Sequence, residues 1–284
     1  MPTPTYRALV LDLDGTLVTT QDHVPPRLAA RLRALDEAGV RVMIATGRSE
    51  TGVQDLITDL GILNPAVIYN GAGLWDPKRQ RMLEERVISG RTARRVLEIA
   101  AGTGDLPVVM RTGEKVGRPP RTDAEREACL GLSALGLSEG EELPHEYLLR
   151  ITLFTERHDN SGAFAAEFES ALSLPVYITH FPLRALAHYP TSPLLVLDVQ
   201  PPCAGKAEAI RYLGETEGIA PEEVVVVGDA TNDLPMFAAA GLAVAVENAM
   251  PEALAAADRV IGPVGTDGLS NLIDELFPSA VRLL

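Results

Sequence analysis

Two aspartates near the N-terminus stand where a buried strand is expected to stop. Asp12 and Asp14 follow the apolar run Ala8–Leu11, and the turn at Gly15 comes directly after them. In a parallel sheet the functional crevice lies at the carboxyl ends of the strands, and alternate residues of an extended chain point to the same side. Two neighbouring carboxylates in a partly dry site repel each other, so a cation must neutralise them or one must hold a proton. Either arrangement supports chemistry.

Further polar clusters follow other expected strands or begin expected helices. They are Thr46-Gly47-Arg48, Gly205-Lys206 and Gly228-Asp229-Ala230-Thr231-Asn232-Asp233. Clustered carboxylates and carbonyl oxygens suit a hard cation such as Mg²⁺, and Asp12 and Asp229 are the natural pair. A hydroxyl, backbone N–H groups at a glycine turn and one lysine suit phosphate oxygens. Each cluster alone is a common turn or cap, but together they indicate phosphoryl transfer.

Apolar strands alternate with amphipathic helices on both sides of the middle third of the chain. Strands are expected at Ala8–Leu11, Val40–Ala45, Ala66–Tyr69, Leu194–Val199, Val224–Val227, Leu242–Val246 and Val260–Ile261. Almost wholly apolar strands that alternate with helices are typical of a parallel sheet covered on both faces. We therefore predict an α/β fold with a doubly wound, mainly parallel sheet.

The middle third of the chain has a different pattern. Leu74-Trp75 and Met82–Ile88 flank the polar turn Asp76–Arg79, which predicts a hairpin. Helices grouped among strands follow, and this mixture indicates a small α+β domain. We place the inserted domain at residues 86–198 and the core at residues 1–85 and 199–284.

Composition narrows the range of partners and locations. The net charge of −14, from 25 Lys and Arg against 39 Asp and Glu, argues against binding to nucleic acid or an anionic membrane surface. Cys129 and Cys203 are far apart, so neither a disulfide framework nor a cysteine zinc site is indicated. No run approaches the roughly 18 apolar residues of a membrane helix, and no signal-type segment is present, so the cytoplasm is the expected location. The sequence indicates no oligomeric state.

In this order, the polar clusters resemble the motifs of the haloacid dehalogenase-like (HAD) phosphohydrolases, and within them the Cof-type sugar-phosphatase group of subclass IIB. Asn70-Gly71-Ala72 and Glu247-Asn248-Ala249 look like two further hallmarks of that group. The resemblance covers nearly the whole chain. It implies a HAD-like, Rossmannoid catalytic core and an inserted α+β cap that acts as a substrate lid.

The resemblance also implies a role for individual residues. Asp12 would be the nucleophile that forms an aspartyl-phosphate, and Asp14 would protonate the leaving alcohol and then activate water. Mg²⁺ would be held by Asp12, Asp229 and the main-chain carbonyl of Asp14, with Asp233 close behind. The residues implied to bind the transferring phosphoryl group are Thr46, Gly47, Lys206 and Asn232.

The expected function is Mg²⁺-dependent hydrolysis of a small phosphorylated metabolite, with a sugar phosphate as the leading candidate. The acid two residues after the nucleophile, Asp14, favours hydrolysis or mutase chemistry over that of the related ion pumps and dehalogenases. A phosphomutase is one alternative, and a non-catalytic regulator that binds a phosphorylated metabolite is another. Arg48 is expected to neutralise a nearby carboxylate or the rim of the site, and Asn248 to brace a loop.

Overall fold

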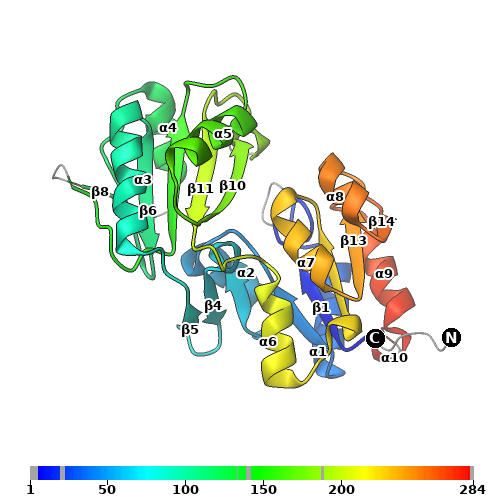
Figure 1. The fold of residues 1–284 in the computed structure, drawn as a ribbon. Helices are drawn as coiled ribbons and strands as arrows, with labels where there is room; N and C mark the ends of the chain where they lie inside the picture. Colours follow the sequence, from blue (N-terminus) through cyan, green and yellow to red (C-terminus); the bar gives the residue numbers. More distant parts are fainter. Residues whose placement is uncertain (1–5, 20–22, 133, 139–141, 187–188, 282–284) are drawn as a thin grey trace. The chain divides into compact units, whose positions relative to one another are not determined.

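The chain forms two compact units, which the computed structural model describes for residues 6–19, 23–132, 134–138, 142–186 and 189–281. The first unit comprises Met1–Glu84 and Gly205–Leu284, and the second comprises Glu85–Ala204 (Figure 1). The chain thus crosses between the units after Glu84 and again after Ala204. The sequence analysis places these crossings after residues 85 and 198.

A parallel sheet forms the centre of the first unit. Its strand order is β14-β13-β12-β1-β2. The strands are β1 (Ala8–Leu11), β2 (Arg41–Ile44), β12 (Val224–Gly228), β13 (Leu242–Val246) and β14 (Arg259–Ile261). Every adjacent pair runs parallel. Every residue of β1 and β12 is buried, as expected for strands covered on both faces. The predicted fold class is confirmed.

Seven α-helices in the described residues of the first unit accompany these strands. They are α1 (Pro26–Glu37), α2 (Glu50–Leu60), α6 (Glu208–Glu217), α7 (Leu234–Ala239), α8 (Pro251–Ala256), α9 (Gly268–Leu276) and α10 (Pro278–Val281). Helix α1 buries Leu28, Leu32 and Leu35 at helical spacing. Helix α2 ends at Gly61, whose φ of 72° is the left-handed conformation typical of a glycine helix cap. No helix in the described ranges is both long and apolar enough to span a membrane.

The parallel register brings the ends of three strands to one edge of the sheet. Leu11 at the end of β1 lies opposite Ile44 of β2 and Val227 of β12. The N–H of Asp12 donates to the carbonyl oxygen of Val227, and that of Ala45 donates to the carbonyl oxygen of Leu11, both at 2.9 Å. The residues that follow β1, β2 and β12 therefore emerge side by side.

A small separate sheet contains β3 (Ala66–Ile68), β4 (Gly73–Asp76) and β5 (Arg81–Glu85). The hairpin predicted around Asp76–Arg79 is confirmed by β4 and β5. The prediction that Ala66–Tyr69 belongs to the parallel sheet is confirmed in part: Val67 forms a parallel bridge with Ala45, and its carbonyl oxygen accepts a hydrogen bond from the N–H of Thr46 at 2.9 Å. A sharp turn at Tyr69 reverses the chain, so the strand β3 itself pairs antiparallel with β4 in a separate sheet.

The second unit has a sheet with the strand order β10-β11-β9-β6-β7-β8. Its strands are β6 (Leu106–Arg111), β7 (Glu114–Gly117), β8 (Leu135–Leu137), β9 (Arg150–Thr155), β10 (Tyr177–Pro182) and β11 (Leu195–Gln200). Its helices are α3 (Gly90–Thr103), α4 (Asp123–Gly131) and α5 (Ser161–Ala171). All adjacent strands are antiparallel except β7 and β8. This unit therefore has the α+β character expected of the insertion.

Strand β11 corrects a further expectation. The sequence analysis assigns Leu194–Val199 to the parallel sheet, but β11 lies in the second unit between β10 and β9. Leu195, Leu197 and Val199 pack into the hydrophobic core that α3 and α5 share with the sheet. All residues of β11 are buried, so its apolar run looks the same as that of a buried parallel strand.

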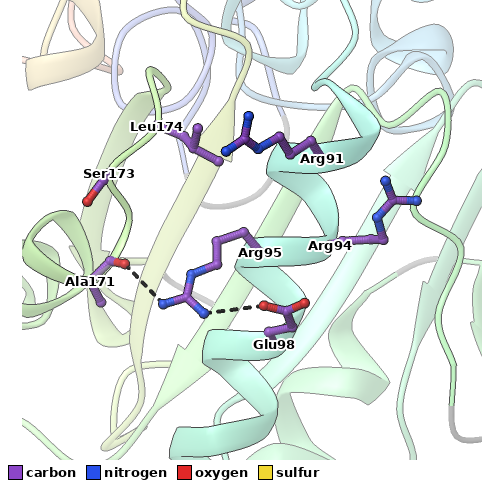
Figure 2. A pocket seen from close by; sticks show the side chains of 7 residues that line it. All are labelled: Arg91, Arg94, Arg95, Glu98, Ala171, Ser173 and Leu174. Atoms are coloured by element: carbon purple, nitrogen blue, oxygen red, sulfur yellow. Dashed lines mark hydrogen bonds and ion pairs between the residues drawn. The ribbon is translucent and has the colours of Figure 1, made fainter.

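A surface pocket of about 380 Å³ lies between α3 and the segment that follows α5. Figure 2 shows the side chains of Arg91 and Arg95 extending from α3 toward that segment. A guanidinium nitrogen of Arg95 lies 3.2 Å from a carboxylate oxygen of Glu98, and another lies 3.5 Å from the carbonyl oxygen of Ala171. The pocket is thus lined by basic side chains in a chain of strongly negative net charge.

Candidate active site

The carboxyl edge of the parallel sheet collects most of the residues that the sequence singled out. Asp12 directly follows β1, and Asp229 directly follows β12. Thr46 lies just beyond β2, and Lys206 lies in the turn that leads into α6. The structure therefore brings residues from opposite ends of the chain to one place.

Lys206 forms the centre of a buried charge cluster. Its ammonium nitrogen Nζ lies 2.5 Å from Oδ1 of Asp12 and 2.6 Å from Oδ1 of Asp233. The side chain of Lys206 is only 1% exposed, and those of Asp12 and Asp233 are 6% and 0% exposed. The sequence suggested a phosphate contact for this lysine but contained no signal for its two carboxylate partners.

Asp233 holds the loop after β12 as well as the lysine. Its Oδ2 accepts hydrogen bonds from the backbone N–H groups of Asp229 and Ala230, at 2.8 and 2.9 Å. A Cβ atom at Gly228 would lie 2.5 Å from the Asp233 carboxyl group, so only glycine fits there. Both carboxylate oxygens of Asp233 are therefore already engaged by this chain.

Asp229 lies against the turn that follows Asp12. Its Oδ1 accepts a hydrogen bond from the Thr16 hydroxyl at 3.3 Å. A Cβ atom at Gly15 would lie 2.4 Å from Oδ2 of Asp229, and the φ of Gly15 is 86°. Glycine at this position satisfies both the close approach and the left-handed backbone. The Asp-x-Asp-Gly turn is thereby locked to the loop after β12.

Burial dominates the electrostatics of the cluster. It raises the pKa of Asp12 well above its ordinary value, and the charge of Lys206 opposes that rise. Burial followed by the charge of Asp233 raises the pKa of Asp229 to about 6. Burial alone would lower the pKa of Lys206, but the carboxylates of Asp12 and Asp233 outweigh it and raise that pKa. Lys206 is therefore protonated at neutral pH.

The residues present fit a divalent cation. Oxygen atoms of Asp12, Asp229 and Asp233 all lie within 4.8 Å of one another. Three carboxylates around one ammonium group leave an excess of two negative charges when all are ionised. A hard cation with oxygen ligands neutralises that excess without adding a proton. Because both oxygens of Asp233 are engaged, Asp12 and Asp229 are the side chains suited to direct coordination.

Asp14 has a different environment from Asp12. Its side chain is 49% exposed and forms a two-pronged ion pair with Arg48, at 3.0 Å from Nε and 2.5 Å from a terminal nitrogen. The expectation that Arg48 neutralises a nearby carboxylate is confirmed. The Asp14 carboxylate thus lies at the rim, outside the buried cluster.

The predicted phosphoryl-binding residues surround the same edge. Thr46 is fully buried, and its hydroxyl accepts a hydrogen bond from the backbone N–H of Arg48 at 3.1 Å. Asn232 donates from Nδ2 to Oδ1 of Asn70 at 3.1 Å. The sequence analysis noted Asn70 as a family hallmark but assigned it no role. The signal that could have indicated a role for Asn70 was its position directly after an apolar strand.

Asn248 braces two loops, as expected. Its Nδ2 donates to the carbonyl oxygen of Gly15 at 3.1 Å, and its Oδ1 accepts from the N–H of Val264 at 2.8 Å. The turn after β1 is thus supported from the C-terminal part of the chain as well.

Known proteins resemble most of the chain. The model of a family described as haloacid dehalogenase-like hydrolase matches residues 9–273. The pyridoxal phosphate phosphatase YbhA of Escherichia coli (strain K12) is 26% identical over 281 residues, covering 95% of this chain and 98% of that protein. The HMP-PP phosphatase of Serratia proteamaculans (strain 568) is 27% identical over 248 residues, covering 87% of this chain and 86% of its own.

A solved structure shares the fold. It is that of a HAD subclass IIB sugar phosphatase, with a TM-score of 0.79 and 21% identity, and the match covers 95% of this chain and 98% of that one. The family match spans nearly all the residues that form both units and includes every polar cluster described above. The chain therefore belongs to the haloacid dehalogenase-like hydrolases.

Proposed function

We propose that this protein is a phosphatase that hydrolyses a small phosphorylated metabolite through a covalent intermediate on Asp12. The observation that carries the proposal is the buried Asp12 carboxylate, held by Lys206 and placed near Asp229. A carboxylate fixed in this way is a nucleophile whose position is set before substrate binds. Covalent catalysis divides one difficult displacement into two easier ones.

In the first step, a carboxylate oxygen of Asp12 attacks phosphorus, and the bond from phosphorus to the alcohol oxygen breaks. Asp14 gives a proton to that alcohol oxygen, and a positioned acid of this kind typically adds about 10²- to 10⁴-fold to the rate. Fixed donors aimed at the phosphoryl oxygens stabilise the transition state. We assign this role to Lys206, Thr46, Gly47 and Asn232.

In the second step, water attacks the aspartyl-phosphate while Asp14 takes a proton from the water. The bond from phosphorus to the Asp12 oxygen breaks, and inorganic phosphate leaves. Asp14 must therefore carry a proton before the first step, whereas its carboxylate accepts hydrogen bonds from Arg48 in the structure. We infer that substrate binding releases Asp14 from Arg48.

The proposal includes Mg²⁺, held by the carboxylates of Asp12 and Asp229 and by the main-chain carbonyl of Asp14. Bound there, the ion would supply positive charge to the phosphoryl oxygens. The contribution of the chain is to fix the two carboxylates. Lys206 holds Asp12, and Thr16 donates to Asp229.

The relatives support a small substrate. Those named above are called phosphatases for pyridoxal phosphate and HMP-PP, and the structural neighbour is called a sugar phosphatase. We propose a sugar phosphate as the first candidate. We also propose that the second unit, Glu85–Ala204, is a cap that excludes water and contacts the leaving group.

Phosphate release from a generic aryl phosphate tests the proposal, with and without Mg²⁺. The variants are Asp12→Asn and Asp14→Asn, with Asp59→Asn on the exposed face of α2 as the matched control. We expect no measurable turnover from Asp12→Asn, slower turnover from Asp14→Asn and wild-type turnover from the control. A panel of sugar phosphates then follows.

Each result bears on one part of the proposal. Unchanged release by Asp12→Asn would exclude Asp12 as the nucleophile. Equal activity after removal of metal with EDTA would exclude the role of Mg²⁺. Accumulation of an isomeric phosphate in place of inorganic phosphate would show a phosphomutase.

A further inference from the structure

The turn that follows β3 contains unusual backbone. Tyr69 and Asn70 both have a φ of 51°, which side-chain-bearing residues rarely adopt. Their exposed fractions are 1% and 3%, whereas Gln80, which has a φ of 50°, is exposed. Strain of this kind costs roughly 1–3 kcal/mol per residue and persists only where surrounding structure enforces it. A buried, strained turn at the edge that carries the candidate active site calls for a functional reason.

Backbone hydrogen bonds join this turn to the loop after β2. The N–H of Tyr69 donates to the carbonyl oxygen of Arg48, and the N–H of Asn70 donates to the carbonyl oxygen of Thr46, both at 3.0 Å. Two backbone hydrogen bonds therefore attach the strained turn to the loop that carries the proposed phosphoryl-binding residue Thr46.

The same turn also supports the segment that leads to Lys206. Gly71 has a φ of 97°, and a Cβ atom on it would lie 2.2 Å from the carbonyl oxygen and 2.3 Å from the nitrogen of Gly205. The two glycine backbones are thus in direct contact. Gly205 immediately precedes Lys206, so contact with the turn restricts the position of the Lys206 backbone.

The Asn70 side chain makes the third connection. Its Oδ1 accepts a hydrogen bond from Nδ2 of Asn232 at 3.1 Å. A Cβ atom on Gly47 would lie only 3.0 Å from the same Oδ1, so Gly47 also packs closely against this amide. An amide nitrogen carries two hydrogens, and Asn70 accepts one of them. In the proposed function, the other hydrogen of the Asn232 amide is assigned to a phosphoryl oxygen.

We propose that Asn70 is a positioning residue for phosphoryl transfer, acting through Asn232. Its amide orients the Asn232 side chain, and its strained turn sets the separation between the Thr46 loop and Lys206. The inference rests on the proposed function, because it concerns how the phosphoryl-binding groups of that reaction are aligned. It gives a functional reason for the strained backbone.

Asn70→Gly separates the side chain from the backbone conformation. Glycine adopts the left-handed conformation without strain, which offsets stability lost with the buried amide, so the melting temperature should change little. Loss of the amide should lower kcat/KM by about 10- to 100-fold, as expected for losing alignment of one hydrogen bond to a charged group. Gln80→Gly is the matched control, because Gln80 shares the backbone conformation in an exposed turn. Its kcat/KM should match the wild type.

A double-mutant cycle tests the route through Asn232. If Asn70 acts through Asn232, then Asn70→Gly should cause no further loss of kcat/KM in an Asn232→Ala background. Additive losses would overturn that route. Wild-type kcat/KM in Asn70→Gly would overturn the positioning role itself.

Different experimental results would contradict this inference and the proposed function. If the wild type releases no phosphate from any substrate tested, the proposed phosphatase activity is wrong. The same cycle is then measured as affinity for orthovanadate, by calorimetry in the presence of Mg²⁺. Tighter or equal vanadate binding by Asn70→Gly, or no binding by the wild type, would contradict the inference.

Discussion

Two of the charged clusters in the described residues differ in their contact with water. In the first unit, Lys206 is 1% exposed and bonds two buried carboxylates at 2.5 and 2.6 Å. On the second unit, the ion pair of Arg95 and Glu98 beside the surface pocket has a longer distance of 3.2 Å (Figure 2). Its side chains are 49% and 65% exposed.

The difference shows that burial fixes the position of a charged side chain before a ligand binds. A buried charge loses its water, so it must have a fixed partner, and its position is then set before any ligand arrives. An exposed pair keeps its water and contributes only about 0–1 kcal/mol. We therefore expect substitutions in the buried cluster to have large effects and those beside the pocket to have small ones.

The largest effect is expected for Lys206→Met. It leaves the buried carboxylates of Asp12 and Asp233 without their ammonium partner, and breaking a buried pair typically costs about 3–5 kcal/mol. Urea unfolding in metal-free buffer at pH 7 measures the free energy of unfolding. Lys78→Met, at an exposed turn, is the control and should change stability by less than about 0.5 kcal/mol. Similar losses from both variants would remove the distinction between buried and exposed charge.

An intermediate effect is expected for Arg157→Gln in the second unit. Arg157 donates to both oxygens of the Asp105 carboxylate at 3.0 Å, and the side chains are 35% and 2% exposed, respectively. Loss of hydrogen bonds to one buried charged group should cost about 1.5–3 kcal/mol in urea unfolding at pH 7. A loss as large as that of Lys206→Met would contradict the ordering by burial.

The stabilisation by Arg157 should depend on pH. Burial alone would raise the pKa of Asp105, but hydrogen bonds from Arg157 and Thr103 outweigh it and lower the pKa below its ordinary value of 3.8. A lowered carboxyl pKa stabilises the fold fully above the ordinary value and progressively less as pH falls through the folded value. The stability difference between wild type and Arg157→Gln should therefore shrink below about pH 4. A difference that grows on acidification would contradict this assignment.

The smallest effect is expected for Arg95→Gln. The exposed pair with Glu98 should contribute no more than about 0.5 kcal/mol, as for other exposed helix pairs. The same urea experiment measures it, with Arg91→Gln on the same helix as the comparison. A loss of more than about 1.5 kcal/mol in the free energy of unfolding would show that the charged side chains beside the pocket stabilise the fold as strongly as buried ones.

Local patterns in the sequence predicted much of the fold and the candidate site. The strands before Asp12 and Asp229 have an apolar run and a polar stop, and both features are visible in consecutive residues. The hairpin at Asp76–Arg79 and the antiparallel insertion also follow from local patterning. These predictions succeeded because strand periodicity and turn chemistry depend on near neighbours.

Features that depend on distant partners were not predicted. Strand β11 was assigned to the wrong sheet, because burial on both faces produces the same apolar run in either setting. The bond from Lys206 to Asp233 joins residues 27 positions apart, and no spacing rule indicates it. The turn at Asn70 likewise makes contacts with Thr46 and Asn232, which are remote in the sequence.

The buried lysine also provides a chemical probe of the first unit. The chain has three lysines, Lys78, Lys115 and Lys206, and of these only Lys206 is fully buried. An amine-reactive acylating reagent should modify the exposed Lys78 rapidly and leave Lys206 unmodified while its ammonium group is enclosed and protonated. Peptide mass spectrometry over time would then report the rate at which the charge cluster opens. Labelling of Lys206 as fast as that of Lys78 would show that the cluster opens freely in solution.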